Sequence, residues 1–281
     1  MNSTSRRSSL IRRSAIASAI AATALLATHT AVANSATQHP GQTAKKPTVV
    51  LVHGAFADSS SWNGVIKDLR REGYPVIAPA NPLRGLHEDA AYLRAVLDSV
   101  PGPVVLAGHS YGGSVLSEAA DGSANVKALV YIASFQPDVG ESTSALAAKF
   151  PGGKLGEALH SVPVPLAGGG TATDLYIEQD KFRAVFAADV PRNTTTLMAA
   201  TQRPITSAAL DDTATKTAWK TIPSWSLITT QDLAIPADSM RFMSQRANSH
   251  TTEIDASHAV TVSQPHAVSN IITKAARATT R

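Results

Sequence analysis

A strand-turn-helix pattern around residue 110 is the feature that most limits how this chain can fold. The apolar run 104–107 leads directly into Gly108-His109-Ser110-Tyr111-Gly112, and a helix-compatible stretch follows over residues 113–120. Glycines two positions before and two positions after the serine let a strand and a helix approach without clashing Cβ atoms. The pattern predicts a sharp turn that holds Ser110 in a strained conformation at the carboxyl edge of a sheet.

Apolar runs and amphipathic helical segments alternate on both sides of this turn. Before residue 135 we expect strands at 48–52, 74–78 and 126–132 and helices at 61–72 and 86–100. After residue 220 we expect strands at 224–230 and 251–255 and helices at 236–247 and 264–278. This alternation predicts an α/β fold with a mostly parallel central sheet and helices on both faces.

The alternation is interrupted between about residue 135 and residue 220. Prolines and the glycine runs 152–153 and 168–170 break this segment into short helical fragments. It is too long for one connection and too irregular to continue the sheet, so we predict an inserted helical cap. We therefore expect one domain over residues 48–281, preceded by a flexible lead-in at 34–47.

The first 33 residues have the features of an export signal. Four arginines at 6, 7, 12 and 13 precede the short apolar core 15–27, and Ala31-Val32-Ala33 forms an A-x-A cleavage site. The apolar core is too short for a permanent membrane span. We expect a secreted or periplasmic protein. The twin-arginine route stays open, because Arg6-Arg7 fits that signal but Ser9 stands where a bulky apolar residue is usual.

Charge and cysteine content exclude several functions. The whole chain has 25 basic and 21 acidic residues, and all four arginines of the signal fall outside the expected mature protein, which leaves no net charge. We therefore expect no nucleic-acid partner. The absence of cysteine excludes disulfides, thiol catalysis and cysteine-ligated metals. The sequence contains no nucleotide-binding P-loop or H-E-x-x-H motif. We expect neither a cofactor nor a metal, and the oligomeric state is not indicated.

Two further residues stand where a serine nucleophile would need a base and an acid. His258 follows the last expected strand, and Asp232 follows the strand before it. The carboxyl ends of parallel strands gather functional groups at one edge of a sheet, so both side chains are expected near Ser110. The rival acid is Asp255, which lies within the last strand and only three residues from His258.

These segments resemble the α/β-hydrolase superfamily, and more narrowly the branch of plant methylesterases, hydroxynitrile lyases and their bacterial esterase relatives. The resemblance covers about residues 48–135 and 222–278, and it is carried by four motifs: the segment 50–56 (VLVHGAF), the segment 108–113 (GHSYGG), the segment 232–236 (DLAIP), and Ala256-Ser257-His258. The chain order Ser, Asp, His is also that of α/β-hydrolases. The cap matches only loosely.

The resemblance implies a catalytic triad of Ser110, His258 and Asp232 and an oxyanion hole made of two backbone N–H groups. These would belong to Tyr111 and Ala55; Phe56 is the alternative second donor, and otherwise its ring would line the substrate pocket. The implied activity is cleavage of a small-molecule carboxylic ester through an acyl-enzyme. A lyase reaction on the same residues and a non-catalytic ligand-binding protein are the alternatives. Gly54 and the lack of a lysine close after Asp232 favour the esterase over the lyase.

Overall fold

A six-stranded parallel sheet forms the centre of the fold in the computed structural model, which describes residues 45–279. The strand order is β2-β1-β3-β4-β8-β9, and every pairing in this sheet is parallel. The strands are β1 (Thr48–Val52), β2 (Val76–Ile77), β3 (Val104–Ser110), β4 (Val126–Ser134), β8 (Ser224–Thr229) and β9 (His250–Ile254). The α/β class predicted from the sequence is confirmed. The predicted signal at 1–33 and nearly all of the lead-in lie outside the described residues.

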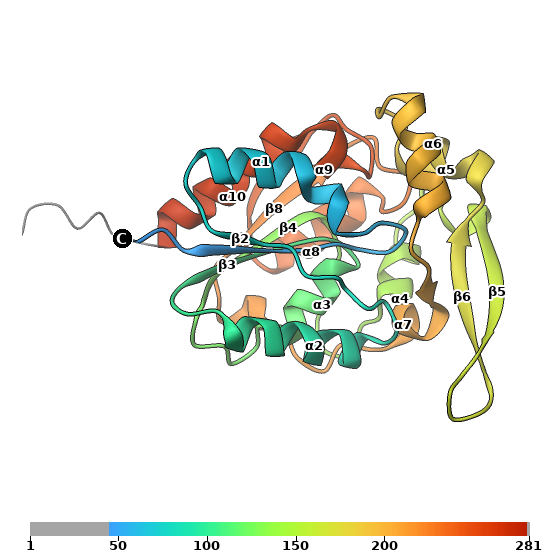
Figure 1. The fold of residues 1–281 in the computed structure, drawn as a ribbon, viewed down its shortest axis with the longest axis horizontal. Helices are drawn as coiled ribbons and strands as arrows, with labels where there is room; N and C mark the ends of the chain where they lie inside the picture. The colour runs from blue at the N-terminus through green and yellow to red at the C-terminus, as the bar shows by residue number, and fades with distance from the viewer. Residues whose placement is uncertain (1–44, 280–281) are drawn as a thin grey trace, which may run out of the picture. The chain divides into compact units, whose positions relative to one another are not determined.

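Helices cover both faces of the sheet (Figure 1). One face carries α1 (Asn63–Arg71) and α10 (Pro265–Thr279), and the opposite face carries α2 (Leu86–Ser99) and α3 (Gly112–Ala119). The remaining helices of this part are η1 (Ser59–Trp62), α8 (Ala237–Arg246) and α9 (Val260–Ser263). Outside the cap, each predicted helix and strand is present, with ends that differ from the prediction by at most three residues. None of the helices in residues 45–279 is long and apolar enough to cross a membrane.

The buried strand β1 shows why the sheet needs helices on both faces. Successive side chains of a strand point to opposite faces. Accordingly, Val50 and Val52 belong to the hydrophobic core shared with α2 and α3, whereas Val49 and Leu51 belong to the core shared with α1 and α10. All four side chains are at most 2% exposed. A continuous apolar run is therefore the sequence expected of this strand.

The inserted segment contains helices, as predicted, and also a small sheet that we did not expect. Its helices are α4 (Thr143–Ala148), η2 (Gly156–Ala158), α5 (Gln179–Phe186), α6 (Arg192–Thr201), α7 (Ser207–Asp211) and η3 (Ala218–Lys220). Its strands β5 (Leu159–Pro165), β6 (Thr171–Ile177) and β7 (Ile205–Thr206) form an antiparallel sheet in the order β5-β6-β7. The prediction that this segment holds no sheet is wrong.

The prolines and glycines of this segment argued against a sheet, but their positions in the hairpin make them compatible with one. Pro163 and Pro165 belong to β5, an edge strand, where a missing N–H does not interrupt the ladder. Gly169 and Gly170 have φ of 88° and 86° and form the turn between β5 and β6. The Leu166 N–H donates to Gly170 O at 3.2 Å and closes this turn. Residues that break helices and central strands are therefore compatible with this hairpin.

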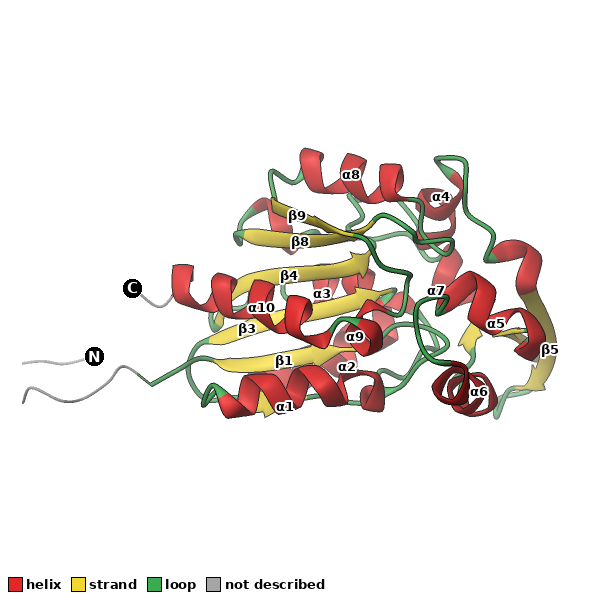
Figure 2. Ribbon diagram, turned by 90° about the horizontal axis from the view of Figure 1, so that it is seen from above, coloured by secondary structure: helices red, strands yellow, loops and turns green. Residues whose placement is uncertain are grey.

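The order of the strands identifies the edge at which a ligand would bind. The chain proceeds from β1 to β2 on one side and then crosses to β3 on the other side of β1. In open parallel sheets, such a reversal leaves a crevice outside the carboxyl ends of the two strands. The arrowheads of β1, β3 and β4 point toward the inserted segment with α5 and α6 (Figure 2). The crevice between β1 and β3 therefore opens toward the cap.

Gly108 offers a test of how tightly β3 and α3 are packed at the turn. A Cβ atom at this position would lie 2.6 Å from Gly112 O and 2.4 Å from Leu116 Cδ2. We predict that Gly108→Ala lowers the free energy of unfolding by about 2 kcal/mol or more, because backbone atoms must move to accept the methyl group. Urea unfolding measures the effect.

Gly156 is the matched control for this substitution. No atom lies within 4 Å of a Cβ atom built there, and its φ is not in the left-handed region. Gly156→Ala should change the free energy of unfolding by less than about 0.5 kcal/mol. Equal stability of the two variants would contradict the close approach of β3 and α3.

Candidate active site

Ser110 is the last residue of β3 and has an unusual backbone conformation. Its φ is 55°, in the left-handed region that is uncommon for residues other than glycine. Such a conformation costs on the order of 1–3 kcal/mol and persists only where the surroundings hold it. Two groups hold it here: the Phe135 N–H and the Ser134 hydroxyl donate to Ser110 O at 3.3 and 2.8 Å. The sharp turn expected from the sequence is therefore present.

His258 and Asp232 form a buried hydrogen-bonded pair. His258 Nδ1 lies 2.7 Å from Asp232 Oδ2, and the two side chains are 1% and 0% exposed. Since an ionised carboxylate only accepts, Nδ1 carries the proton and donates. The neutral imidazole then presents the lone pair of Nε2, the atom that a general base uses.

Three more donors hold the Asp232 carboxylate in place. The Thr229 hydroxyl donates to Oδ2 at 2.8 Å, and the N–H groups of Ala234 and Ile235 donate to Oδ1 at 2.8 and 2.9 Å. Thr229 was not anticipated, because nothing in the sequence distinguishes it from other strand threonines. The rival acid Asp255 is exposed and has a 3.5 Å contact with Thr230 Oγ1 instead. The structure brings Asp232, and not Asp255, to His258.

His109 connects the loop of His258 to the residue that precedes Ser110. His109 Nε2 donates to His258 O at 2.9 Å, and the two rings lie 4.7 Å apart. Among the described residues, no hydrogen bond joins Ser110 Oγ to His258 Nε2. Since catalytic hydrogen bonds in unliganded enzymes often form only with substrate bound, the missing bond does not exclude His258 as the base.

The loop after β1 contributes the residues proposed for the oxyanion hole. The Phe56 N–H donates to Arg203 O at 3.0 Å, so it is engaged and not directed at a ligand. Among the described residues, the N–H groups of Ala55 and Tyr111 have no hydrogen-bond partner, and both residues line the same cavity as Ser110. Of the two alternatives for the second donor, the structure therefore leaves Ala55 available.

Gly54 allows this loop to lie directly against the turn. A Cβ atom at residue 54 would lie 2.7 Å from Ser110 Cβ and 2.7 Å from His109 O. Any larger residue would displace the turn or the loop. The absence of a side chain at this position thus sets the spacing between the two N–H groups and the serine.

A cavity of about 340 Å³ opens beside Ser110. Among the described residues, those that line it carry no formal charge, and most are small or apolar. Phe56 is among them, as expected, and its ring packs edge-on against Phe186 at 6.2 Å. The lining consists of Ala55, Phe56, Ser110, Tyr111, Phe135, Thr143, Ser144, Ala147, Ala148, Gly153, Leu155, Gly156, Leu159, Leu210 and Ala234. Such a cavity suits an uncharged organic ligand.

The cap also contacts the loop that carries His258. The Phe186 ring lies 4.8 Å from the His258 ring, and Phe186 O accepts a hydrogen bond from the Ala259 N–H at 2.9 Å. The Ser257 hydroxyl donates to Asp189, in the connection between α5 and α6. These two cap residues were not found from the sequence, because the cap matched the resembled family only loosely.

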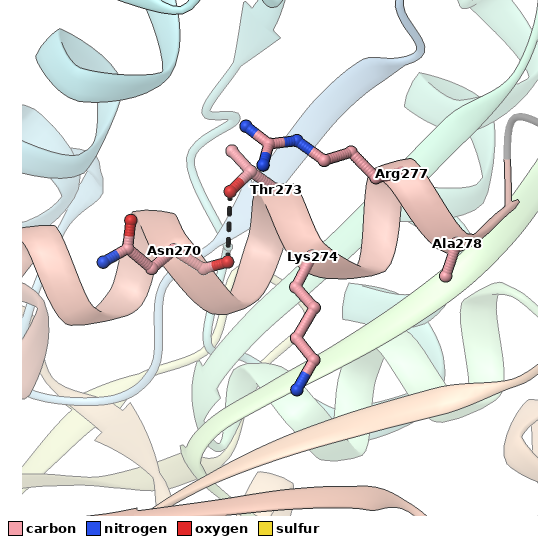
Figure 3. A pocket seen from close by; sticks show the side chains of 5 residues that line it. All are labelled: Asn270, Thr273, Lys274, Arg277 and Ala278. Carbon is pink, nitrogen blue, oxygen red and sulfur yellow. Dashed lines mark hydrogen bonds between the residues drawn. The ribbon is translucent and has the colours of Figure 1, made fainter.

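A second hollow lies along α10, away from this constellation. Asn270, Thr273, Lys274, Arg277 and Ala278 line it (Figure 3), and none of them lines the cavity at Ser110. The two cationic side chains point away from each other (Figure 3). The hollow therefore lacks the convergent polar groups of a binding site. Nor does any group of three or more His, Asp or Glu side chains in the described part of the chain form a candidate metal site.

Comparisons with known proteins bear on the family and the fold of the chain. A family model described as "Alpha/beta hydrolase family" matches residues 49–271. The chain is 33% identical over 113 residues to a carbendazim hydrolyzing esterase of Nocardioides sp. (strain SG-4G), a match that covers 36% of this chain and only 47% of that protein. It is 26% identical over 255 residues to the alpha/beta hydrolase nvfD of Aspergillus novofumigatus (strain IBT 16806), and this match covers 82% of this chain and 97% of that protein.

The same fold is found in a solved structure of polyneuridine aldehyde esterase. The TM-score is 0.71 at 18% sequence identity, and the match covers 82% of this chain and 98% of the other. At this identity the likeness shows the fold alone. The chain spans about half the length of the first two curated relatives that it matches, 47% and 50%, so their activities do not transfer to it directly.

The buried His109 makes a testable contribution to the pH dependence of stability. Burial, and next the nearby His258, lower the pKa of His109 to about 3. In the unfolded chain a histidine titrates near pH 6.5. The folded-state pKa is depressed, so the stability that His109 contributes is complete above about pH 6.5 and is lost as the pH falls toward 3.

We predict that His109→Gln weakens this dependence, since a glutamine amide can still donate to His258 O and does not titrate. Between pH 7 and pH 5 the free energy of unfolding of the unsubstituted protein should fall by about 2 kcal/mol more than that of the variant. Urea unfolding at the two pH values gives both quantities. Parallel pH dependence of the two proteins would show that His109 is not held neutral by burial.

Proposed function

The chain belongs to the alpha/beta hydrolase family, and we propose that it is a serine hydrolase that cleaves carboxylic esters. The observation that carries the proposal is the arrangement around one cavity. Ser110 in its strained turn and the two unpaired N–H groups of Ala55 and Tyr111 line it, and His258, held by Asp232, lies against the turn. Relatives named as esterases and hydrolases support the reaction class.

The proposed reaction proceeds in two steps. His258 Nε2 takes the proton from Ser110 Oγ as the oxygen attacks the ester carbonyl, and Asp232 stabilises the resulting imidazolium. The N–H groups of Ala55 and Tyr111 stabilise the oxyanion, and donors of this kind contribute roughly 3–4 kcal/mol each. The alcohol leaves with the proton from His258, and a water molecule activated by the same histidine then hydrolyses the acyl-enzyme.

The cavity supports an uncharged ester as substrate. Its lining residues offer no cation to pair with a carboxylate or phosphate on the substrate and no carboxylate to pair with an amine. Desolvating a charge in such a place would cost several kcal/mol without compensation. We therefore propose neutral esters with small or medium-sized apolar groups, which fit a space of about 340 Å³.

The structure gives a further argument for the esterase over the lyase. In the resembled lyases a threonine occupies the place of Gly54, but here a Cβ atom at that position would lie 2.7 Å from Ser110 Cβ. A threonine could not be accommodated in this loop as it stands. The close packing of Gly54 against the turn thus favours ester hydrolysis by the triad and the two backbone donors over the lyase reaction.

Substitution of the proposed nucleophile tests the function. Ser110→Ala should lower kcat for p-nitrophenyl esters by on the order of 10⁶, because the members of a triad act as a unit. A fluorophosphonate should phosphonylate the unsubstituted protein with loss of fluoride, which adds the mass of the reagent less HF, and should leave this variant unmodified. Graded acyl chain lengths in the same assay measure the preference of the cavity.

Ser117→Ala is the control, since this buried serine on α3 bonds to Tyr131 and is not part of the site. It should keep most of the turnover. If Ser110→Ala lowered kcat only a few-fold, Ser110 would not be the nucleophile. If the unsubstituted protein bound ligands but resisted the fluorophosphonate, the alternative of a non-catalytic binding protein would replace the hydrolase.

We also propose that the protein is exported, on the basis of the arginine-rich start, apolar core and A-x-A site in residues 1–33. Expression of the full chain in a bacterial host should release a protein that begins at Asn34, as N-terminal sequencing would determine. Replacing Arg6 and Arg7 by lysine should block export only if the twin-arginine route is used. An uncleaved chain that stays in the cytoplasm would refute the proposal of export.

A further inference from the structure

The residue after the nucleophile has its side chain anchored in the core. The backbone of Tyr111 lies at the turn, whereas its hydroxyl donates at 2.9 Å to Oδ2 of Asp89, a residue of α2. The two residues are 1% and 0% exposed. Tyr111 therefore connects the cavity at Ser110 to a carboxylate that lies inside the protein and takes no part in the proposed reaction.

Asp89 is itself held at its second oxygen. The Arg84 N–H donates to Asp89 Oδ1 at 3.1 Å. The guanidinium of Arg84 reaches the cap, where it pairs with Asp174 Oδ1 at 2.7 Å and donates to Pro204 O at 3.0 Å. Asp89 also lies in the first turn of α2, where the helix dipole favours a negative charge. The acceptor of the Tyr111 hydroxyl is therefore fixed in position.

Stability alone does not account for this buried pair. Burial raises the pKa of Asp89, which means that the environment disfavours its ionised form. Replacing both members of a buried polar pair with apolar groups of similar shape is often neutral or stabilising. A phenylalanine and an aliphatic residue would fill this space without a desolvation cost, so the bond is expected to serve the position of Tyr111 rather than the stability of the fold.

The peptide group between Ser110 and Tyr111 is where position matters. Its carbonyl is held by Ser134 and Phe135 from the end of β4. In a trans peptide the N–H points opposite to the carbonyl, so these bonds fix one side of the plane that carries the oxyanion donor. The N–H side of the plane depends on Tyr111, which follows Ser110 with its strained φ. Because the Tyr111 side chain is anchored, the Tyr111 N–H cannot rotate to relieve the strain at Ser110.

We propose that Asp89 is a positioning residue for the oxyanion hole and acts through the hydroxyl of Tyr111. The inference rests on the proposed function, because it assigns the Tyr111 N–H to a transition-state oxyanion. Removing the Tyr111 hydroxyl leaves the Tyr111 N–H in place but lets the direction of this N–H vary. Since this N–H binds the oxyanion of the transition state, the weaker hydrogen bond lowers kcat and leaves the affinity for the substrate unchanged.

The test compares two buried tyrosines next to α3. Tyr111→Phe should lower kcat for a p-nitrophenyl ester about tenfold, less than the 10²–10³ for complete loss of a donor, with KM changed less than about twofold. The inhibition constant of a trifluoromethyl ketone, which forms the same oxyanion, should rise by the factor by which kcat/KM falls. Tyr131→Phe removes a buried hydroxyl bonded to Ser117 at 2.8 Å and should leave both quantities within about twofold.

A double variant separates position from stability. Tyr111→Phe together with Asp89→Val leaves no unpaired carboxylate, although the part-buried Arg84 N–H loses its acceptor. Its melting temperature should therefore lie above that of Tyr111→Phe alone, while kcat remains about tenfold lower. Asp89→Asn should keep most of the activity, because its amide can donate to the Tyr111 hydroxyl while its oxygen accepts from Arg84 N–H. Asp89→Asn would lose activity if Asp89 acted through its negative charge.

Three outcomes would overturn the inference. The first is a folded Tyr111→Phe variant whose kcat stays within twofold of the unsubstituted protein. The second is the same result for the folded double variant. The third is a Tyr131→Phe variant that loses as much kcat as Tyr111→Phe. Failure of the proposed function is recognised separately, in the unsubstituted protein: if it neither turned over esters nor reacted with a fluorophosphonate, the hydrolase proposal would fail, and the role of Asp89 with it. Turnover in the unsubstituted protein with unchanged Tyr111→Phe would refute the role of Asp89 alone.

Discussion

The strained backbone at Ser110 is the constraint on which the rest of the site depends. A φ of 55° at a serine is unfavourable and needs support from every side. The end of β4 holds its carbonyl, Gly54 packs against its Cβ position, and α3 begins two residues later. The parallel sheet brings these parts together, because β1, β3 and β4 end at the same edge. The fold thus supports the conformation that Ser110 needs for its proposed role as nucleophile.

Residues of the inserted cap contact two loops of the proposed site, the loop of His258 and the loop after β1. Phe186 and Asp189 contact the loop of His258, and the carbonyl oxygen of Arg203 accepts a hydrogen bond from the Phe56 N–H beside the proposed oxyanion hole. Arg84, which supports Asp89, is paired with Asp174 of the cap. The cap and the loops of the proposed site therefore support each other, so we expect a change in the cap to alter both the cavity and the geometry of the site.

The sequence predicted the parts of the molecule in which local pattern and tertiary structure agree. The central strands and helices, the turn at Ser110 and the nearness of His258 to Asp232 all follow from apolar periodicity and from the convergence of parallel strands. The hairpin β5–β6 was missed because edge position, which makes proline acceptable, is not visible in the chain. Thr229, Asp89 and Phe186 were missed because their importance comes only from contacts between distant segments.

A crystal structure of the protein after reaction with a fluorophosphonate would test the central claim most directly. The account predicts phosphorus bonded to Ser110 Oγ, with the phosphoryl oxygen about 2.7–3.1 Å from the N–H nitrogens of Ala55 and Tyr111. It also predicts His258 Nε2 within hydrogen-bond range of the Ser110 oxygen, with Nδ1 still bonded to Asp232. A phosphonyl group on another residue, or one whose oxygen points away from both N–H groups, would contradict the account.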